Sequence, residues 1–149
     1  MDNEQLKLDN QLCFRLYTAA RLMMSAYYPL LEPLGLTYPQ YLVLLVLWEN
    51  DCLPVCDIAN RLVLETNTVT PLLQRMEKAG LIVRTKGERD TRQRIVSLTE
   101  KGRLLRDRAL HVPECLSADI LDKTASIDEL TALIPQLDKL IAGLKQITK

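Results

Sequence analysis

The chain has 149 residues, a length that suits one ordinary globular domain. Hydrophobic residues make up 48% and charged residues 26%, which excludes a disordered or collagen-like chain. Lysine plus arginine and aspartate plus glutamate both number 19, so the formal net charge is zero. The charge is unevenly distributed, because residues 61–108 hold 12 basic and 6 acidic side chains. Such a local surplus is typical of a nucleic-acid-binding surface, which the net charge alone argues against.

The longest uninterrupted apolar run, Tyr41–Trp48, has eight residues, far fewer than the roughly 20 that a transmembrane helix needs. No basic segment followed by an apolar one opens the sequence, as it would in a signal peptide, since residues 2–5 are polar or acidic. We therefore expect a cytoplasmic protein with no membrane partner. In a reducing compartment the four cysteines are expected to be thiols, metal ligands or redox sensors, not structural disulfides.

The spacing of apolar residues predicts helices over most of the chain. The first predicted helix covers residues 9–28 and ends at Pro29 and Pro33. The second covers residues 37–48 and starts with a Thr-Tyr-Pro-Gln capping box. Its apolar run predicts burial on nearly all sides.

Two shorter helices are predicted in the middle of the chain. One covers residues 54–62. The other begins with Thr66 or Asn67 as its N-cap, carries Pro71 in its first turn and ends at Gly80.

The only strand pattern comes next, at residues 81–86 and 92–98 around a polar turn, and it predicts a hairpin. Thr99 is expected to cap a further helix that continues to about His111. Pro113 is expected to interrupt the chain there.

The last predicted helix follows a second capping box, Ser126 to Glu129. Its apolar residues have the heptad spacing of a helix-packing seam. They are Leu130, Leu133, Leu137, Leu140, Leu144 and Ile147. The seam either packs on the chain's own first helix or meets a second subunit. We favour a homodimer, because two terminal helices with apolar faces need more partner surface than so small a domain supplies. Pro135 argues against a straight coiled coil.

Two short helices followed by a basic hairpin are typical of a winged helix-turn-helix. The second of these helices carries short polar side chains in its first turns, which either cap the helix or reach phosphates and base edges. The candidate DNA-binding residues on this helix are Thr66, Asn67, Thr68, Thr70, Gln74 and Arg75.

The hairpin carries a net three positive charges on 11 residues, as expected of a loop that enters a minor groove or follows a phosphate backbone. A charge run is usually only solvated surface, but this one follows the helix pair at the spacing of a wing. The candidate DNA-binding residues of the hairpin are Arg84, Lys86, Arg89, Arg92 and Arg94. Double-stranded DNA is therefore the expected partner.

Two segments resemble the MarR family of transcription regulators. Residues 68–81, Thr-Val-Thr-Pro-Leu-Leu-Gln-Arg-Met-Glu-Lys-Ala-Gly-Leu, are similar to the family's recognition helix. Asp90-Thr-Arg92, followed by Leu98-Thr99 and Gly102, is similar to its wing signature. The resemblance implies that Arg92 reaches the minor groove and that Asp90, a further candidate DNA-binding residue, orients it.

The same resemblance extends over nearly the whole chain and implies its organisation. It implies one MarR-type domain over residues 1–149, mainly helical with a small β-hairpin wing. Residues 1–36 and 100–149 would supply the dimerisation helices, and residues 37–99 the winged helix-turn-helix. The implied partners are a second copy of the chain and a palindromic operator.

Residues 9–17 and 34–41 indicate the class of effector, because they are similar to the organic hydroperoxide resistance repressor branch of the family. That resemblance implies an organic hydroperoxide as effector and Cys13 as its redox sensor. It also implies a sensor pocket that contains Tyr17, Tyr27 and Tyr38.

The residues around Cys13 support a sensor without requiring one. Cys13 falls near the first turn of its predicted helix, where the helix dipole and Arg15 favour the thiolate. Tyr17 lies four residues further on, hence on the same face. Tyr27 lies 14 residues away, roughly 21 Å along the axis, so it reaches Cys13 only from another subunit. The alternative role of Cys13 is a buried small apolar residue.

The other cysteines have weaker indications. Cys115 follows Pro113 in a predicted helix break, and the family resemblance makes it the candidate resolving cysteine. A one-cysteine mechanism with a small thiol or overoxidation stays open. Cys52 and Cys56 have C-x3-C spacing, but a structural zinc needs four converging ligands, so we expect no metal and no cofactor.

The sequence therefore predicts a repressor, not an enzyme, that leaves its operator when organic hydroperoxide oxidises Cys13. A regulator controlled by a small aromatic ligand is the nearer alternative. A thiol peroxidase is the second, although no Thr or Ser stands three residues before Cys13 and a basic wing has no use there.

Overall fold

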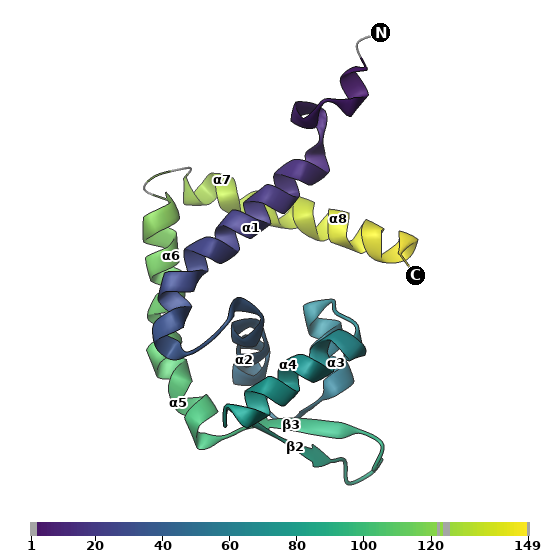
Figure 1. Ribbon diagram of the computed structural model, residues 1–149, viewed down its shortest axis with the longest axis vertical. Coiled ribbons are helices and arrows are strands. Elements are labelled where there is room, and N and C mark those ends of the chain that lie inside the picture. The colour runs from purple at the N-terminus through teal and green to yellow at the C-terminus, as the bar shows by residue number, and fades with distance from the viewer. Residues whose placement is uncertain (1–2, 122, 124–125, 149) are drawn as a thin grey trace. The chain divides into compact units, whose positions relative to one another are not determined.

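The structure is a computed structural model that describes residues 3–121, 123 and 126–148. The chain is mainly helical with one small sheet, as predicted (Figure 1). It folds as two compact units, Met1–Val112 and Pro113–Lys149.

The first unit opens with two short 3-10 turns, η1 (Glu4–Leu6) and η2 (Leu8–Asn10), and a long helix α1 (Leu12–Leu31). The expected stop at Pro29 is wrong, because α1 runs through it. Proline removes one backbone hydrogen bond. Leu30 and Leu31 lie beyond it and pack in or against the core, which holds the last turn in place.

Helix α2 (Tyr38–Glu49) follows the 3-10 turn η3 (Glu32–Leu34). The predicted capping box is present: the Thr37 N–H donates to Gln40 Oε1 at 3.0 Å. Five residues of α2 are buried, including Val43 and Leu44, which are fully enclosed. The apolar run of this helix therefore forms the centre of the core, as expected.

Helices α3 (Val55–Leu62) and α4 (Thr66–Lys78) form the predicted pair. The predicted N-cap is wrong, since Glu65 holds that position and Thr66 and Asn67 are already helical. Pro71 is consequently the sixth residue of α4 and not part of its first turn. The extra length places more of the polar segment on the helix itself.

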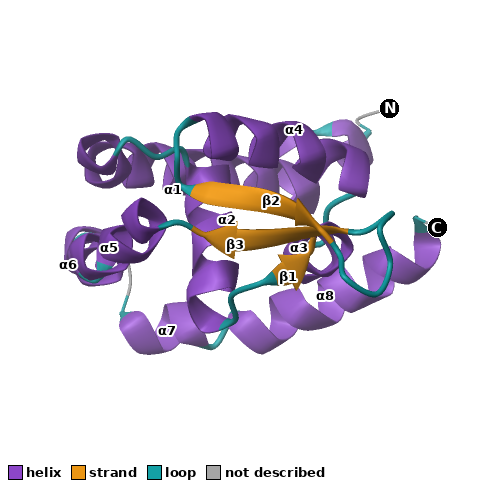
Figure 2. Ribbon diagram, turned by 90° about the horizontal axis from the view of Figure 1, so that it is seen from below, coloured by secondary structure: helices purple, strands orange, loops and turns teal. Residues whose placement is uncertain are grey.

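The sheet has the order β1-β3-β2, built from β1 (Leu53–Pro54), β2 (Ile82–Lys86) and β3 (Arg94–Leu98) (Figure 2). Strands β2 and β3 pair antiparallel from Ile82 opposite Leu98 to Lys86 opposite Arg94. This is the predicted hairpin. The two-residue β1, which pairs Leu53 with Val96, is too short to leave a period-2 pattern in the sequence.

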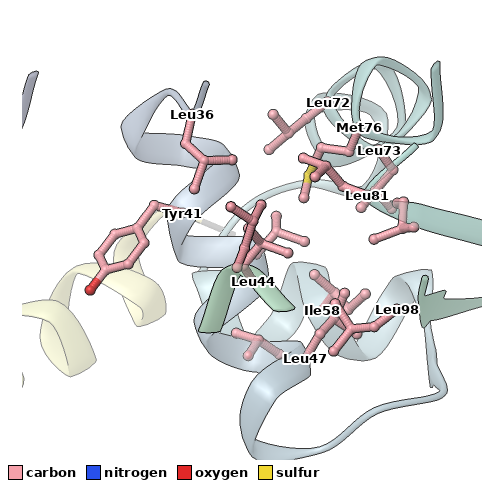
Figure 3. Packing of buried hydrophobic residues seen from close by; sticks show 14 of the residues in the cluster. Leu36, Tyr41, Leu44, Leu47, Ile58, Leu72, Leu73, Met76, Leu81 and Leu98 are labelled. Atoms are coloured by element: carbon pink, nitrogen blue, oxygen red, sulfur yellow. The ribbon is translucent and has the colours of Figure 1, made fainter. Parts of the chain in front are cut away.

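The core of the first unit joins α2, α3, α4 and the hairpin (Figure 3). Helix α4 contributes Val69, Leu72, Leu73 and Met76, the i, i+3, i+4, i+7 face of an amphipathic helix. They pack in one cluster with residues of α2, with Ile58 of α3 and with Val96 and Leu98 of β3. This packing fixes α4 between α2 and the sheet and leaves its polar face outward.

Helix α5 (Glu100–Ala109) is capped by Thr99, whose hydroxyl accepts the Gly102 N–H at 3.1 Å, as predicted. The Thr99 N–H donates to the Leu81 carbonyl at 3.1 Å. Trp48 Nε1 donates to the Gly102 carbonyl at 3.0 Å. A Cβ at Gly102 would stand 2.2 Å from the Leu81 carbonyl oxygen. Only glycine allows α5 to come this close to Leu81, the residue before β2.

A second anchor of the sheet is Asp51, in the turn between α2 and β1. One carboxylate oxygen accepts the N–H groups of Cys52 and Leu98, both at 2.8 Å. The other accepts from Arg103 Nη2 of α5 at 3.1 Å. Burial alone would raise the pKa of Asp51, but these donors more than offset it and hold the pKa below its ordinary value.

The second unit contains most of α6 (His111–Leu121), then α7 (Ile127–Thr131) and α8 (Ile134–Ile147). The predicted interruption at Pro113 is wrong: the break falls at Leu110, and Pro113 lies in the first turn of α6, where its missing N–H costs nothing. The Ser126 capping box is confirmed, with the Ser126 N–H donating to Glu129 Oε2 at 3.0 Å. Pro135 starts a new helix, so the predicted final helix is divided in two.

Among the described residues, no single helix is long and apolar enough to cross a membrane. In the same part of the chain, the helices Leu12–Leu34 and Tyr38–Glu49, bent by 71° relative to one another, meet the length and composition requirement only as a pair.

Replacing Gly102 by alanine should lower the free energy of unfolding by about 2 to 3 kcal/mol, because the Leu81 carbonyl is backbone and has no rotamer to escape into. Gly143 of α8 is the control, since a Cβ there meets no atom within 4 Å. Gly143→Ala should be neutral or stabilising by up to about 1 kcal/mol. Urea unfolding followed by circular dichroism measures both. Equal effects of the two substitutions would contradict this role of Gly102.

Replacing Asp51 by asparagine should lower the free energy of unfolding at neutral pH by about 1 to 3 kcal/mol, since charged acceptors form the stronger hydrogen bonds. Because the pKa of Asp51 is lowered by folding, its stabilisation is complete above about pH 4 and is lost as the pH falls further. The difference between wild type and Asp51→Asn should therefore shrink at about pH 3. Asp138→Asn, an exposed position on α8, is the control. A wild-type to Asp51→Asn difference that does not change with pH would rule out this role.

Candidate functional site

The outward face of α4 carries the polar residues predicted to bind DNA. Because the opposite face is locked in the core, Thr66, Asn67 and Thr68 are held outward on the first turn. Gln74 and Arg75 are also exposed, further along the helix. The free N–H groups of a helix start favour a phosphate at this end.

A hollow of about 270 Å³ lies between α4 and the hairpin. Five predicted DNA-binding residues line it: Thr66, Thr70, Arg84, Arg92 and Arg94. Residues that are far apart in sequence thus form one basic surface with hydroxyl groups at its edge. Cys56, the second residue of α3, lines the same hollow.

The hairpin loop projects from the sheet, away from α3 and α4 (Figure 1). The Arg92 side chain is 91% exposed there, and its Nε donates to Asp90 Oδ1 at 3.2 Å. The Arg92 backbone N–H donates to the same oxygen at 3.0 Å. Lys86, Arg89 and Asp90 line a second hollow of about 450 Å³ on the hairpin. The contact between Asp90 and Arg92 is the one that the family resemblance implies.

Arg84 differs from the other predicted contacts because its guanidinium is already bound. Its Nε and Nη2 donate to Glu77 Oε2 at 3.0 and 2.8 Å, and its backbone N–H donates to Glu77 Oε1 at 2.9 Å. These bonds to Arg84 hold the pKa of Glu77 below its ordinary value. Sequence reasoning missed Glu77. Its carboxylate keeps Arg84 from being a free cation at the surface.

Cys13 is the second residue of α1 and is exposed. The helix begins three residues later than predicted, which moves the thiol into the first turn, beside unpaired backbone N–H groups. Arg15 Nη1 donates back to the Gln11 carbonyl at 3.2 Å, so a guanidinium lies along this turn. Tyr17 follows on the same face of the helix and is 67% exposed. Cys13 and Tyr17 form the exposed end of α1.

The other two predicted sensor tyrosines meet near the opposite end of α1, where Tyr27 of α1 packs against Tyr38, the first residue of α2. The rings of Tyr27 and Tyr38 are 4.7 Å apart, and Tyr41 lies 6.0 Å from Tyr27. Tyr41 was missed, although its spacing of three from Tyr38 on a helix places both on one face. Burial raises the pKa of Tyr27, and the neighbouring phenols raise it further. These tyrosines therefore stay protonated at neutral pH and remain hydrogen-bond donors.

The remaining cysteines are dispersed. Cys52 precedes β1 with a left-handed backbone (φ 61°), and its sulfur accepts from the Ser97 hydroxyl at 3.3 Å. Cys115 lies inside α6, so the expected position in a helix break is wrong. In the described part of the chain, no three His, Cys, Asp or Glu side chains converge as a metal site would require.

Comparison with known proteins agrees with these features. The MarR family model matches residues 36–93. The organic hydroperoxide resistance transcriptional regulator of Bacillus subtilis is 49% identical over 110 residues, which span 74% of this chain and 75% of that protein.

Solved structures of AbfR, a protein of Staphylococcus epidermidis, are also similar. Reduced AbfR bound to DNA has 35% identity and a TM-score of 0.80, with 97% of this chain and 99% of that one covered. Disulfide-formed AbfR has 37% identity and a TM-score of 0.64, with 96% and 95% covered. The extent of these matches and the winged-helix architecture lead to one conclusion: the chain belongs to the MarR family of transcription regulators.

Proposed function

We propose that the chain is a cytoplasmic, homodimeric repressor that binds a palindromic DNA operator and releases it when an organic hydroperoxide oxidises Cys13. The observation that carries this proposal is the exposed thiol in the first turn of α1, at the far end of the helix from the tyrosine cluster. Membership of a family of regulators leaves no support for the peroxidase alternative.

DNA binding is assigned to α4 and the hairpin. The first turn of α4 would enter a major groove, and Arg92 would reach an adjacent minor groove. The hollow that joins Thr66 and Thr70 to Arg92 and Arg94 supports a single continuous contact surface. Reduced AbfR, a similar protein, has been solved bound to DNA.

The dimer is supported by the apolar surface of α1. Of its 20 residues only Leu31 is buried in the single chain. Its large exposed apolar side chains are Leu12, Phe14, Tyr17, Leu22, Met23, Met24 and Tyr28. A surface of this kind marks a protein interface. A second copy covers it with two-fold symmetry, and a two-fold dimer reads a palindrome.

The sensor is completed across that dimer. Cys13 lies roughly 21 Å along the helix axis from Tyr27 of its own chain, too far for a shared contact. A hydroperoxide held by neutral phenols would therefore meet the thiol of the other subunit. Oxidation of Cys13 at this interface would move the two DNA-contacting regions of the dimer relative to one another.

The oxidation step balances with the peroxide as the only oxidant. The Cys13 thiolate attacks the terminal peroxide oxygen, the O–O bond breaks, and the leaving alkoxide takes a proton and departs as the alcohol. Cys13 becomes a sulfenic acid. A second thiol then attacks the sulfenic sulfur, which forms a disulfide and releases water.

Replacing Cys13 by serine should leave operator affinity unchanged and abolish the response to peroxide. Fluorescence anisotropy with a labelled operator, titrated with cumene hydroperoxide, measures both. We expect a loss of affinity of about tenfold or more for the oxidised wild type and none for Cys13→Ser. Cys52→Ser and Cys56→Ser are controls that should lose operator affinity on peroxide treatment by the same factor as the wild type, whatever their starting affinity, since Cys56 lines the hollow beside α4. Peroxide-induced release of Cys13→Ser would show that the sensor lies elsewhere, whereas release by phenolic ligands alone would favour the aromatic-ligand alternative.

We assign Cys115, half-buried in α6, as the thiol that resolves the sulfenic acid of the partner subunit. A disulfide-formed structure of AbfR supports a resolving thiol. After peroxide treatment, non-reducing gels should show a covalent dimer for the wild type and none for Cys115→Ser. A crosslink that persists in Cys115→Ser would eliminate this assignment in favour of a one-cysteine mechanism.

A further inference from the structure

The contact between Glu77 and Arg84 ties the recognition helix α4 to the hairpin. Glu77 lies in the last turn of α4, and Arg84 is the third residue of β2. One carboxylate accepts three hydrogen bonds, two from the guanidinium and one from the backbone N–H of the strand. Charge-assisted bonds of this number define an orientation as well as a distance. The direction of the strand is thereby set relative to α4.

The position of Arg84 argues against a role as a DNA contact. Its side chain is 21% exposed, whereas that of Arg92 is 91% exposed. Its Nε and Nη2 are both directed at Glu77. A phosphate would have to compete with a carboxylate already in place. The partly buried Arg84 guanidinium is better explained as a structural support of the hairpin that carries the exposed arginines.

We infer that Glu77 is a positioning residue for DNA binding that acts through Arg84, by fixing the hairpin relative to α4 so that both reach the same duplex. The inference rests on the proposed DNA binding. It assigns a contribution to operator affinity to an acidic residue that touches no DNA.

Because Glu77 is acidic, charge repulsion and positioning predict opposite effects on operator affinity when Glu77 is neutralised. A carboxylate near a phosphate backbone weakens binding by repulsion, so its neutralisation alone would strengthen binding. Positioning predicts the opposite result, since without Glu77 the hairpin is no longer held. Glu88 is the matched control: it is an exposed carboxylate of the same hairpin, with no hydrogen bond or ion pair to the described residues.

The test measures the affinity of Glu77→Gln and Glu88→Gln for a duplex selected from a random pool by the wild-type protein. Fluorescence anisotropy is recorded at several salt concentrations. We expect Glu77→Gln to bind about tenfold more weakly with an unchanged salt dependence. Glu88→Gln should bind as tightly as the wild type or more tightly. Trypsin should also cleave after Arg89 and Arg92 faster in Glu77→Gln than in the wild type or in Glu88→Gln.

Arg84→Lys separates positioning from direct contact. Lysine replaces arginine well at a phosphate but cannot reproduce the paired donors that Glu77 receives. We expect Arg84→Lys to bind as weakly as Glu77→Gln, and the double variant to bind no more weakly than either. Arg92→Gln is the reference for an exposed arginine that contacts DNA directly, with a log–log salt slope reduced by up to about 0.9.

Two results would overturn the inference: wild-type or tighter binding by Glu77→Gln, or wild-type binding by Arg84→Lys. If Glu77→Gln proves unfolded by circular dichroism, Arg84→Lys decides alone. A wild-type protein that selects no duplex would instead reject the proposed DNA binding, and the positioning role with it.

Discussion

The close approach of α5 to the end of α4 is the contact on which the first unit depends. Gly102 lies against the Leu81 carbonyl, where a methyl group has no room. Thr99 bonds to that carbonyl from its N–H, and Trp48 reaches the Gly102 carbonyl from α2. Three elements therefore meet at one backbone junction. Because the junction combines hydrogen bonds to two backbone carbonyls with one missing side chain, it has a single geometry.

That junction and Asp51 together hold the start of the hairpin in place. Asp51 holds the end of β3 and bonds to Arg103 of α5. Glu77 holds β2 from the other side, through Arg84. The hairpin is thus fixed at its base by two carboxylates, and only its loop is left to project. A hairpin held in this way carries Arg92 on its loop, with the guanidinium facing solvent and bonded to Asp90.

The basic surplus of residues 61–108 has two roles. Part of it is structural: Arg61 pairs with Glu49, Arg84 with Glu77 and Arg103 with Asp51. Another part bonds to backbone carbonyls, as Lys101 and Arg108 do. What remains for a nucleic acid is concentrated on the hairpin and the outer face of α4. The neutral total of the chain hides this surface, because the balancing carboxylates lie largely elsewhere in the sequence.

Local rules in the sequence predicted most elements. The helices, both capping boxes, the hairpin and the positions of Thr99 and Cys13 near helix starts follow from periodicity and capping, which act within a few residues. The same rules failed at Pro29, where the helix continues around the proline, and at Pro113, which lies in the first turn of a new helix. They also missed β1, whose existence depends on its pairing with β3.

The candidate site likewise has features that the sequence determines and features that depend on the tertiary structure. The sequence by itself determined which side chains are available: a polar first turn on α4, a basic hairpin, and one thiol four residues from a tyrosine. Only the tertiary structure decided which of them meet. In the structure Thr66 and Arg92 line one hollow, and the Arg84 guanidinium is bonded to Glu77. Tyr41 packs with the tyrosine cluster. The physical reason is that residue chemistry is local, whereas partnership between side chains depends on how distant elements pack.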